Sequence, residues 1–189
     1  LFSIILTVEH EGKIKPFYLN FNAAPDAPTE YVLTPDHLRE LTRIWSDPTK
    51  TWYVHKANHD LHFLSVEGIE LAGTIHCTKA IAMVEYNEHK GYALDECAGR
   101  IGYTKMGTIQ PWLLKNGLTE KRMGANQQYT HYPYDKAPFD LIVPYGEQDG
   151  VAGYALGKWQ EGILNERDKE TPDPLPKVGN IARNEKRLV

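Results

Sequence analysis

Short apolar stretches with the two-residue period of β-strands open the chain. Leu1 to Glu9 alternates and is rich in β-branched residues, and Pro16 to Phe21 resumes the pattern after a turn at residues 11–13. These two stretches predict an antiparallel hairpin. Residues 51–55 and 73–77 predict two further short strands. The first of these turns at once into a helical pattern through a polar cluster, and such strand-to-helix junctions are where α/β proteins place their sites.

Helical periodicity occupies most of the remaining chain. Thr34 predicts an N-cap and Pro35 the first helical position, with Leu38, Leu41 and Trp45 on the buried face of that helix. Further helical patterns are found at residues 56–68, 79–85, 92–101 and within 107–117. The order of strands and helices therefore predicts a mixed α/β fold.

The same patterns predict which side chains are buried and which segment forms a loop. Phe63, Met83 and Val84 are expected to face inward from their helices. Residues 118–140 are polar and aromatic and predict a long surface loop. The aromatic side chains from Tyr129 to Phe139 are expected to pack rather than to stack on bases.

A glycine-rich helix is predicted at residues 144–163, PYGEQDGVAGYALGKWQEGI. Pro144 suits its first turn, where a missing N–H costs nothing. An apolar stripe follows, made of Ala152, Leu156, Trp159 and Ile163. Tyr145 and Asp149 are four residues apart, so a helix places phenol and carboxylate on one face, about 6 Å apart at Cβ. Each glycine costs roughly 1 kcal/mol relative to alanine, which predicts close packing against another element.

Composition restricts the function classes. The chain has 189 residues and a net charge of −4, which argues against a broad nucleic-acid-coating surface but leaves room for a nuclease with a metal-lined cleft. Cys77 and Cys97 are the only cysteines, so core thiols in a reducing compartment are expected. No apolar run reaches the length of a transmembrane helix, and no membrane partner is predicted.

Two stretches resemble known nuclease motifs. VHKANHDLHFL, residues 54–64, is similar to the second exonuclease motif of the 3′–5′ exonuclease domain of family A DNA polymerases, within the DEDD (DnaQ-like) superfamily. PFDLIVPYGEQDGVAGYAL, residues 138–156, resembles the third motif, of the Tyr-x-x-x-Asp subtype. The resemblance covers nearly the whole chain and maps the functional residues on to Asp60, Tyr145 and Asp149. On its own, the Tyr145–Asp149 pair is also compatible with an ordinary solvated first turn, and Asp60 with an ordinary first-turn aspartate.

The resemblance implies an RNase H-like mixed sheet flanked by helices. The first motif of the family, Asp-x-Glu on a central strand, is missing from the chain and is expected just upstream of Leu1. The sequence therefore predicts a fragment that does not form a continuous sheet by itself. Residues 1–167 are expected to form the exonuclease-like domain, 168–180 a linker, and 181–189 the start of a helix of the following polymerase region.

By this resemblance the protein is a proofreading exonuclease of a bacterial or phage-infected cytoplasm. Two Mg²⁺ or Mn²⁺ ions would be held by Asp60, Asp149 and the two upstream carboxylates, and Tyr145 would orient the attacking water. The partners would be a single-stranded 3′ end of DNA and a polymerase domain, in the same chain or another.

Two alternatives remain open from the sequence. Lys56 and His59 stand where the second motif usually has Asn and an aromatic residue, which is compatible with a catalytically inactive domain that only positions DNA or the polymerase. His55, His59 and His62 have helical spacing and predict a mononuclear zinc site in the second alternative.

Overall fold

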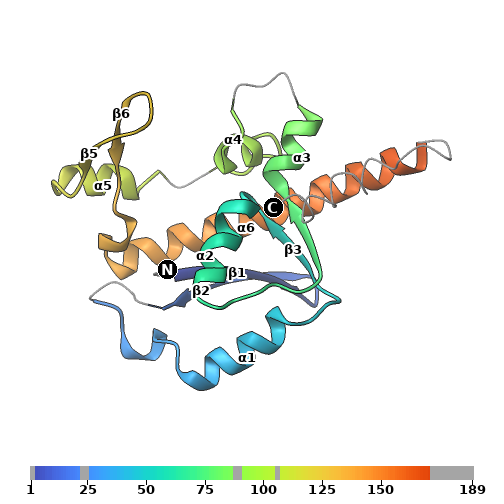
Figure 1. Cartoon of the computed structure of the whole chain (residues 1–189), viewed down its shortest axis with the longest axis horizontal. Coiled ribbons are helices and arrows are strands. Elements are labelled where there is room, and N and C mark those ends of the chain that lie inside the picture. Colours follow the sequence, from blue (N-terminus) through green and yellow to red (C-terminus); the bar gives the residue numbers. More distant parts are fainter. Residues whose placement is uncertain (1–2, 22–25, 87–90, 105–106, 171–189) are drawn as a thin grey trace. The chain divides into compact units, whose positions relative to one another are not determined.

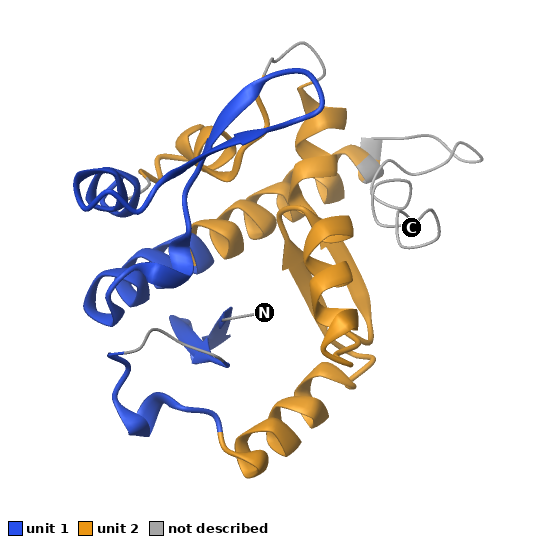
Figure 2. Ribbon diagram, turned by 60° about the vertical axis from the view of Figure 1, so that its left-hand side comes forward, with its two compact units in different colours: residues 1–33, 105–150 blue, residues 34–104, 151–189 orange. Residues whose placement is uncertain are grey.

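The computed structural model describes residues 3–21, 26–86, 91–104 and 107–170 (Figure 1). These residues form a mixed α/β structure with six α-helices and three separate two-stranded sheets. Two compact units emerge, residues 1–33 with 105–150 (unit 1) and residues 34–104 with 151–189 (unit 2), coloured separately in Figure 2. The segment predicted as one domain, 1–167, is thus shared between two units.

The first hairpin of unit 1 is confirmed. β1 (Ser3–His10) pairs antiparallel with β2 (Lys13–Asn20), from Ser3 opposite Asn20 to His10 opposite Lys13. Glu11 and Gly12 connect the strands with positive φ values of 51° and 72°. Two consecutive left-handed residues match the right-handed twist of the strands, and glycine reaches this conformation without a Cβ clash.

The core of unit 1 is a cluster beside this hairpin. Its buried residues are Ile109, Leu113, Ala137 and Ile142. They come from α5 (Ile109–Lys115), from the end of a short 3-10 turn (Tyr134–Lys136) and from the first turn of α6 (Phe139–Glu170). Tyr18 of β2 packs against the cluster and meets the ring of Phe139 edge-on, with centroids 6.0 Å apart. Unit 1 therefore joins chain segments more than a hundred residues apart.

Residues 118–140 do not form one long loop. β5 (Glu120–Met123) and β6 (Gln128–His131) make an antiparallel hairpin with four residue pairs. The expected packing of the aromatic residues holds for Tyr132 and Tyr134, which lie against the unit 1 core. Tyr129, at the hairpin tip, is 47% exposed and does not pack in this way. The loop prediction was wrong because both strands are short and mostly polar, so the two-residue period is weak.

Unit 2 contains a parallel strand pair. β3 (Thr51–Val54) lies beside β4 (Thr74–Cys77), with α2 (Ala57–Val66) as the crossover and α3 (Thr78–Glu85) after β4. Parallel strands require such a crossover connection. Ala57, Ile75 and Cys77 form the buried centre of this arrangement.

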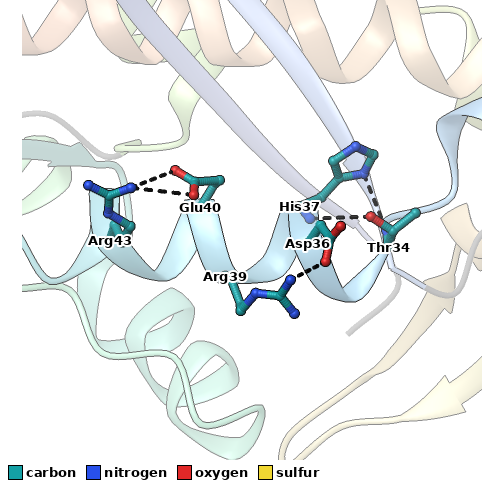
Figure 3. Close-up of polar contacts among 6 residues, drawn as sticks. All are labelled: Thr34, Asp36, His37, Arg39, Glu40 and Arg43. Carbon is teal, nitrogen blue, oxygen red and sulfur yellow. Dashed lines mark hydrogen bonds and ion pairs between the residues drawn. The ribbon is translucent and has the colours of Figure 1, made fainter.

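Helix α1 (Pro35–Trp45) begins where the sequence predicted. The hydroxyl of Thr34 accepts a hydrogen bond from the backbone N–H of His37, and Nδ1 of His37 accepts one from the N–H of Thr34, both at 3.3 Å. This reciprocal capping box satisfies two N–H groups that the helix leaves unpaired (Figure 3). Leu41 and Trp45 are buried, at 9% and 5% exposure, which confirms the predicted face.

Three predictions about buried side chains were wrong. Phe63, Met83 and Val84 are exposed by 45%, 49% and 57%. In α3 the buried apolar residues are instead Ile81, which packs with Leu164, and Ala82, which packs with Leu156 and with Cys97 of α4 (Leu94–Gly99). The periodicity identified the helix, but the position of α6 decided which of its faces is buried. Cys77 and Cys97 are buried free thiols, as predicted.

Helix α6 is longer than predicted at both ends. It begins at Phe139, so Pro144 lies inside the helix rather than in its first turn. A proline there cannot donate to the carbonyl of Asp140 and removes one helical hydrogen bond. Its end at Glu170 places residues 168–170 in the helix, although they were predicted as linker. The rest of the predicted linker and the predicted helix start at 181–189 lie outside the described residues.

The largest sheet among the described residues has two strands. Within the described residues the strands therefore form no continuous sheet. None of the described helices combines the length and apolar character needed to span a membrane.

Candidate functional site

Tyr145 and Asp149 lie one turn apart on α6, in unit 1. Both side chains are half-buried. The ring of Tyr145 packs against the unit 1 core, with its centroid 5.7 Å from that of Tyr134. The phenol of Tyr134 accepts a hydrogen bond of 2.8 Å from the side-chain amide of Gln110. The predicted pair is therefore brought together on a helix turn whose aromatic member is fixed by packing.

Two glycines hold this turn close to β1. A Cβ at Gly146 would lie 2.6 Å from Cδ1 of Ile5, and one at Gly150 would lie 2.6 Å from Cγ2 of Ile5 and closer still to the hydroxyl of Thr7. Real Cβ atoms do not approach carbon this closely, so a side chain at either position would force Ile5, and at Gly150 also Thr7, to move. The close packing predicted from the glycine content is confirmed here, at the residue that follows Tyr145 and at the residue that follows Asp149.

A glycine also permits close packing of α6 in unit 2. A Cβ at Gly157 would collide with the ring of Tyr53, whose hydroxyl donates a 2.8 Å hydrogen bond to Glu161 on the next turn of α6. Gly153 and Gly162 have open space at the corresponding position. Close packing thus explains three of the five glycines predicted to lie on this helix.

Asp60 lies in the first turn of α2, in unit 2. Its side chain is 47% exposed, and Oδ1 lies 3.2 Å from Nδ1 of His59. Lys56 occupies the N-cap position of α2 without a side-chain capping bond. The structure therefore places the carboxylate at the junction after β3, as predicted, beside the two residues that depart from the nuclease motif.

His55 is engaged in a different way from the other histidines. Its Nε2 lies 2.9 Å from the carbonyl oxygen of Tyr92, and its Nδ1 lies 3.0 Å from the hydroxyl of Thr78. A carbonyl can only accept, so Nε2 carries the hydrogen and Nδ1 accepts from Thr78. Burial lowers the pKa of His55 below its usual 6.5, with the bond to Tyr92 opposing this shift.

This geometry bears on the zinc alternative. α2 begins at Ala57, so His55 does not share a helical face with His59 and His62, and that part of the expectation was wrong. Both ring nitrogens of His55 already have hydrogen-bond partners within the protein. His59 and His62 instead pack their rings against Phe63.

The two predicted carboxylates do not form a metal-binding cluster with other described side chains. Across the described residues, no group of three or more His, Cys, Asp or Glu side chains is arranged to hold a metal ion. Asp149 and Asp60 supply one carboxylate each, from different units. Two carboxylates fit the oxygen preference of Mg²⁺ and Mn²⁺ but are too few to hold a metal pair by themselves.

One feature of unit 2 was not anticipated from the sequence. The guanidinium of Arg100 lies 4.7 Å above the ring centre of Tyr86, and that ring stacks on Trp159 with an angle of 8° between the planes. Arg167 pairs with the buried carboxylate of Glu85 at 2.8 Å, next to this stack on α3 and α6. The contacts join α3, α6 and the segment after α4 within unit 2, so we assign them to packing, although Oε1 of Glu85 is buried without a hydrogen-bond partner among the described residues.

No family model matches the chain, and no curated protein matches it.

Proposed function

We propose that the protein is a 3′–5′ exonuclease domain of the DEDD type, with an RNase H-like fold, that removes nucleotides from single-stranded 3′ ends of DNA. The observation that carries the proposal is the Tyr145–Asp149 turn. Phenol and carboxylate share one face of α6, and Gly146 and Gly150 hold that turn against β1. A catalytic pair must be held rigidly to work, and glycines at these positions provide that close support.

The roles follow from the chemistry of phosphodiester hydrolysis. Asp149 and Asp60 would be ligands for two divalent ions, Mg²⁺ or Mn²⁺, and the metal pair would need further carboxylate ligands besides these two. The ions would supply charge stabilisation for the attacking and leaving oxygens. The Tyr145 hydroxyl would donate to, and so orient, the attacking water. The half-burial of Tyr145 favours this role, because packing limits the positions that its hydroxyl can adopt.

Removal of the carboxylate tests the proposal. The polypeptide as the cell makes it, including whatever precedes Leu1, is incubated with a 5′-labelled single strand and Mg²⁺ or Mn²⁺, and the shortened products are separated. Asp149→Ala is expected to slow removal of 3′ nucleotides more than about 100-fold, since a metal ligand contributes several kcal/mol to the transition state. Tyr145→Phe should slow it less, because only a hydroxyl is lost.

The matched control is Asp140→Ala, which removes an exposed aspartate from the first turn of the same helix. It should leave the rate unchanged. Undiminished cleavage by Asp149→Ala would contradict the assignment of Asp149.

A second candidate is a domain that binds DNA without cutting it. Lys56, exposed at the N-cap of α2, favours this candidate because it places a positive charge where the second exonuclease motif usually has Asn, in a region that would have to bind metal cations. Tight binding of a single strand, with no shortening by the unaltered protein in either metal, would establish this candidate and exclude the exonuclease.

A further inference from the structure

The β5–β6 hairpin is rooted in the core and open at its tip. The residues that flank it, Leu118 and Tyr132, both pack against the unit 1 core. All four residues of β5 are exposed, and Met123 reaches 81% exposure. Figure 1 shows the hairpin as a ribbon that extends beyond α5. An isolated two-stranded hairpin with no buried face has little stability of its own. Among the described residues, the exposed side chains at the tip make no packing contact with the unit 1 core, so packing does not account for their identity.

Basic groups surround the one carboxylate of the hairpin. The guanidinium of Arg122 pairs with Glu120 at 2.8 Å, and this bond, with smaller contributions from His131 and Lys136, holds the pKa of Glu120 below its usual value. Lys121 lies on the opposite face, where its ammonium donates to the hydroxyl of Thr130 at 2.7 Å. The hairpin and its base carry Lys121, Arg122 and Lys136 against Glu120 and Asp135, a net charge of +1 on a chain with a net charge of −4.

The tip adds groups that suit a nucleobase. Gly124, Ala125, Asn126, Gln127 and Tyr129 line an open hollow of about 590 Å³. Asn126 and Gln127 carry amides that both donate and accept, and the exposed ring of Tyr129 offers a stacking face. The volume falls in the range of small-molecule sites, which is ample for one nucleotide.

We infer that the β5–β6 hairpin is a grip for single-stranded DNA, with Lys121 and Arg122 contacting phosphates and Tyr129 stacking on a base. Charge complementarity selects this occupant: lysine and arginine neutralise a phosphate backbone, while a lysine on an exposed strand disfavours pairing with a second copy of the chain. The inference rests on the proposed function, because the strand that is held is the one that the exonuclease shortens.

Binding is measured separately from hydrolysis to test the grip. Fluorescence anisotropy of a labelled oligothymidine in EDTA, where no strand can be cut, gives the dissociation constant of the full polypeptide. Hydrolysis of a thymidine dinucleotide in Mn²⁺ gives the activity on the shortest strand that can be cut.

Two variants of the hairpin should weaken binding. Tyr129→Ala is expected to raise the dissociation constant roughly 5-fold or more, as loss of one stacked base does. Lys121→Gln with Arg122→Gln should raise it further and reduce the salt dependence of binding by about 1.4 in log–log slope. Dinucleotide hydrolysis should stay unchanged in both variants.

Control variants separate the grip from general charge and from folding. Tyr129→Phe should bind like the unaltered protein, because the stacking face remains. Lys13→Gln with Lys15→Gln removes two exposed charges from β2 in the same unit and should leave the slope nearly unchanged. Circular dichroism of each variant verifies that the fold persists.

The outcomes are distinct. Unchanged binding in the hairpin variants, with strand binding and hydrolysis intact, overturns the grip and leaves the exonuclease standing. A dimer that Tyr129→Ala dissociates without any change in DNA binding also overturns it, in favour of a contact between copies. A protein that neither binds the strand nor hydrolyses the dinucleotide overturns both proposals.

Discussion

The two hairpins of unit 1 are the same kind of element in opposite surroundings. β1–β2 has eight residue pairs, and β1 is half-buried over six of its residues because α6 approaches it through Gly146 and Gly150. β5–β6 has four pairs, and burial is limited to the residues at its base. Because the β1–β2 hairpin packs closely against α6, the helix has glycines at the two positions of closest approach. A hairpin held only at its root leaves its side chains available to a partner.

The largest expected effect comes from the core that anchors the β5–β6 hairpin. Leu113 is fully buried in the cluster against which Leu118 and Tyr132 pack. Leu113→Ala should lower the free energy of unfolding by about 2–5 kcal/mol, because it leaves a cavity. Urea denaturation followed by circular dichroism measures this change. Leu114→Ala, at a neighbour that is 60% exposed, should stay within about 0.5 kcal/mol; equal losses at both positions would argue against this core.

The contact of α6 with the β1–β2 hairpin should be the next most sensitive feature. Gly150→Val places methyl groups where Ile5 and Thr7 already lie, and should cost roughly 1–3 kcal/mol of stability. Gly153→Ala, on the same helix with open space around it, should instead stabilise by up to about 1 kcal/mol. Thermal melts of the two variants give the comparison, and a stabilising Gly150→Val would show that β1 does not approach α6 closely.

Alkaline pH should lower the free energy of unfolding through Tyr18, a half-buried tyrosine of the β1–β2 hairpin. Burial raises the pKa of Tyr18 on β2 above its usual 10, an effect that a hydrogen bond with Ser3 partly offsets. The unfolded chain then loses this proton more readily than the folded one, so stability is retained below pH 10 and falls as the pH rises above it. Urea denaturation at pH 9 and pH 10.5 should show the fall, and Tyr18→Phe should reduce it. An identical fall in Tyr18→Phe would assign the effect to other tyrosines or lysines.

The smallest effect is expected at the tip of the second hairpin. Met123 is 81% exposed, so Met123→Thr should change the free energy of unfolding by less than about 0.5 kcal/mol. Ile5→Thr, on β1 where α6 packs, should cost clearly more in the same denaturation experiment. Equal costs would mean that the β5–β6 tip is buried in solution, contrary to the role proposed for it.

Local signals explain most of what the sequence predicted correctly. Thr34 and Pro35 marked the start of α1 because capping depends only on neighbouring backbone groups. The spacing of Tyr145 and Asp149 placed them on one helix face for the same reason. The β5–β6 hairpin was missed, although Gly124 and Asn126 between its two short strands were a usable turn signal.

Burial was predictable only in part. Met83 and Val84 were expected inside and lie outside, because a short helix with apolar residues on several sides can present any of them to the core. His55 was counted with the helical histidines, but its ring bonds to Thr78 and Tyr92, which are more than twenty residues away along the chain. No local pattern encodes such partners.

The sequence by itself determined the elements: the β1–β2 turn, the cap of α1, the parallel-strand junction that carries Asp60, and the helix turn that carries Tyr145 and Asp149. These depend on backbone geometry and on neighbours within a few residues. Only the tertiary structure decided that Gly146 and Gly150 lie against β1 while Gly153 is open, and that one hairpin is packed while the other is exposed. Such outcomes depend on contacts between distant segments, which local periodicity does not specify.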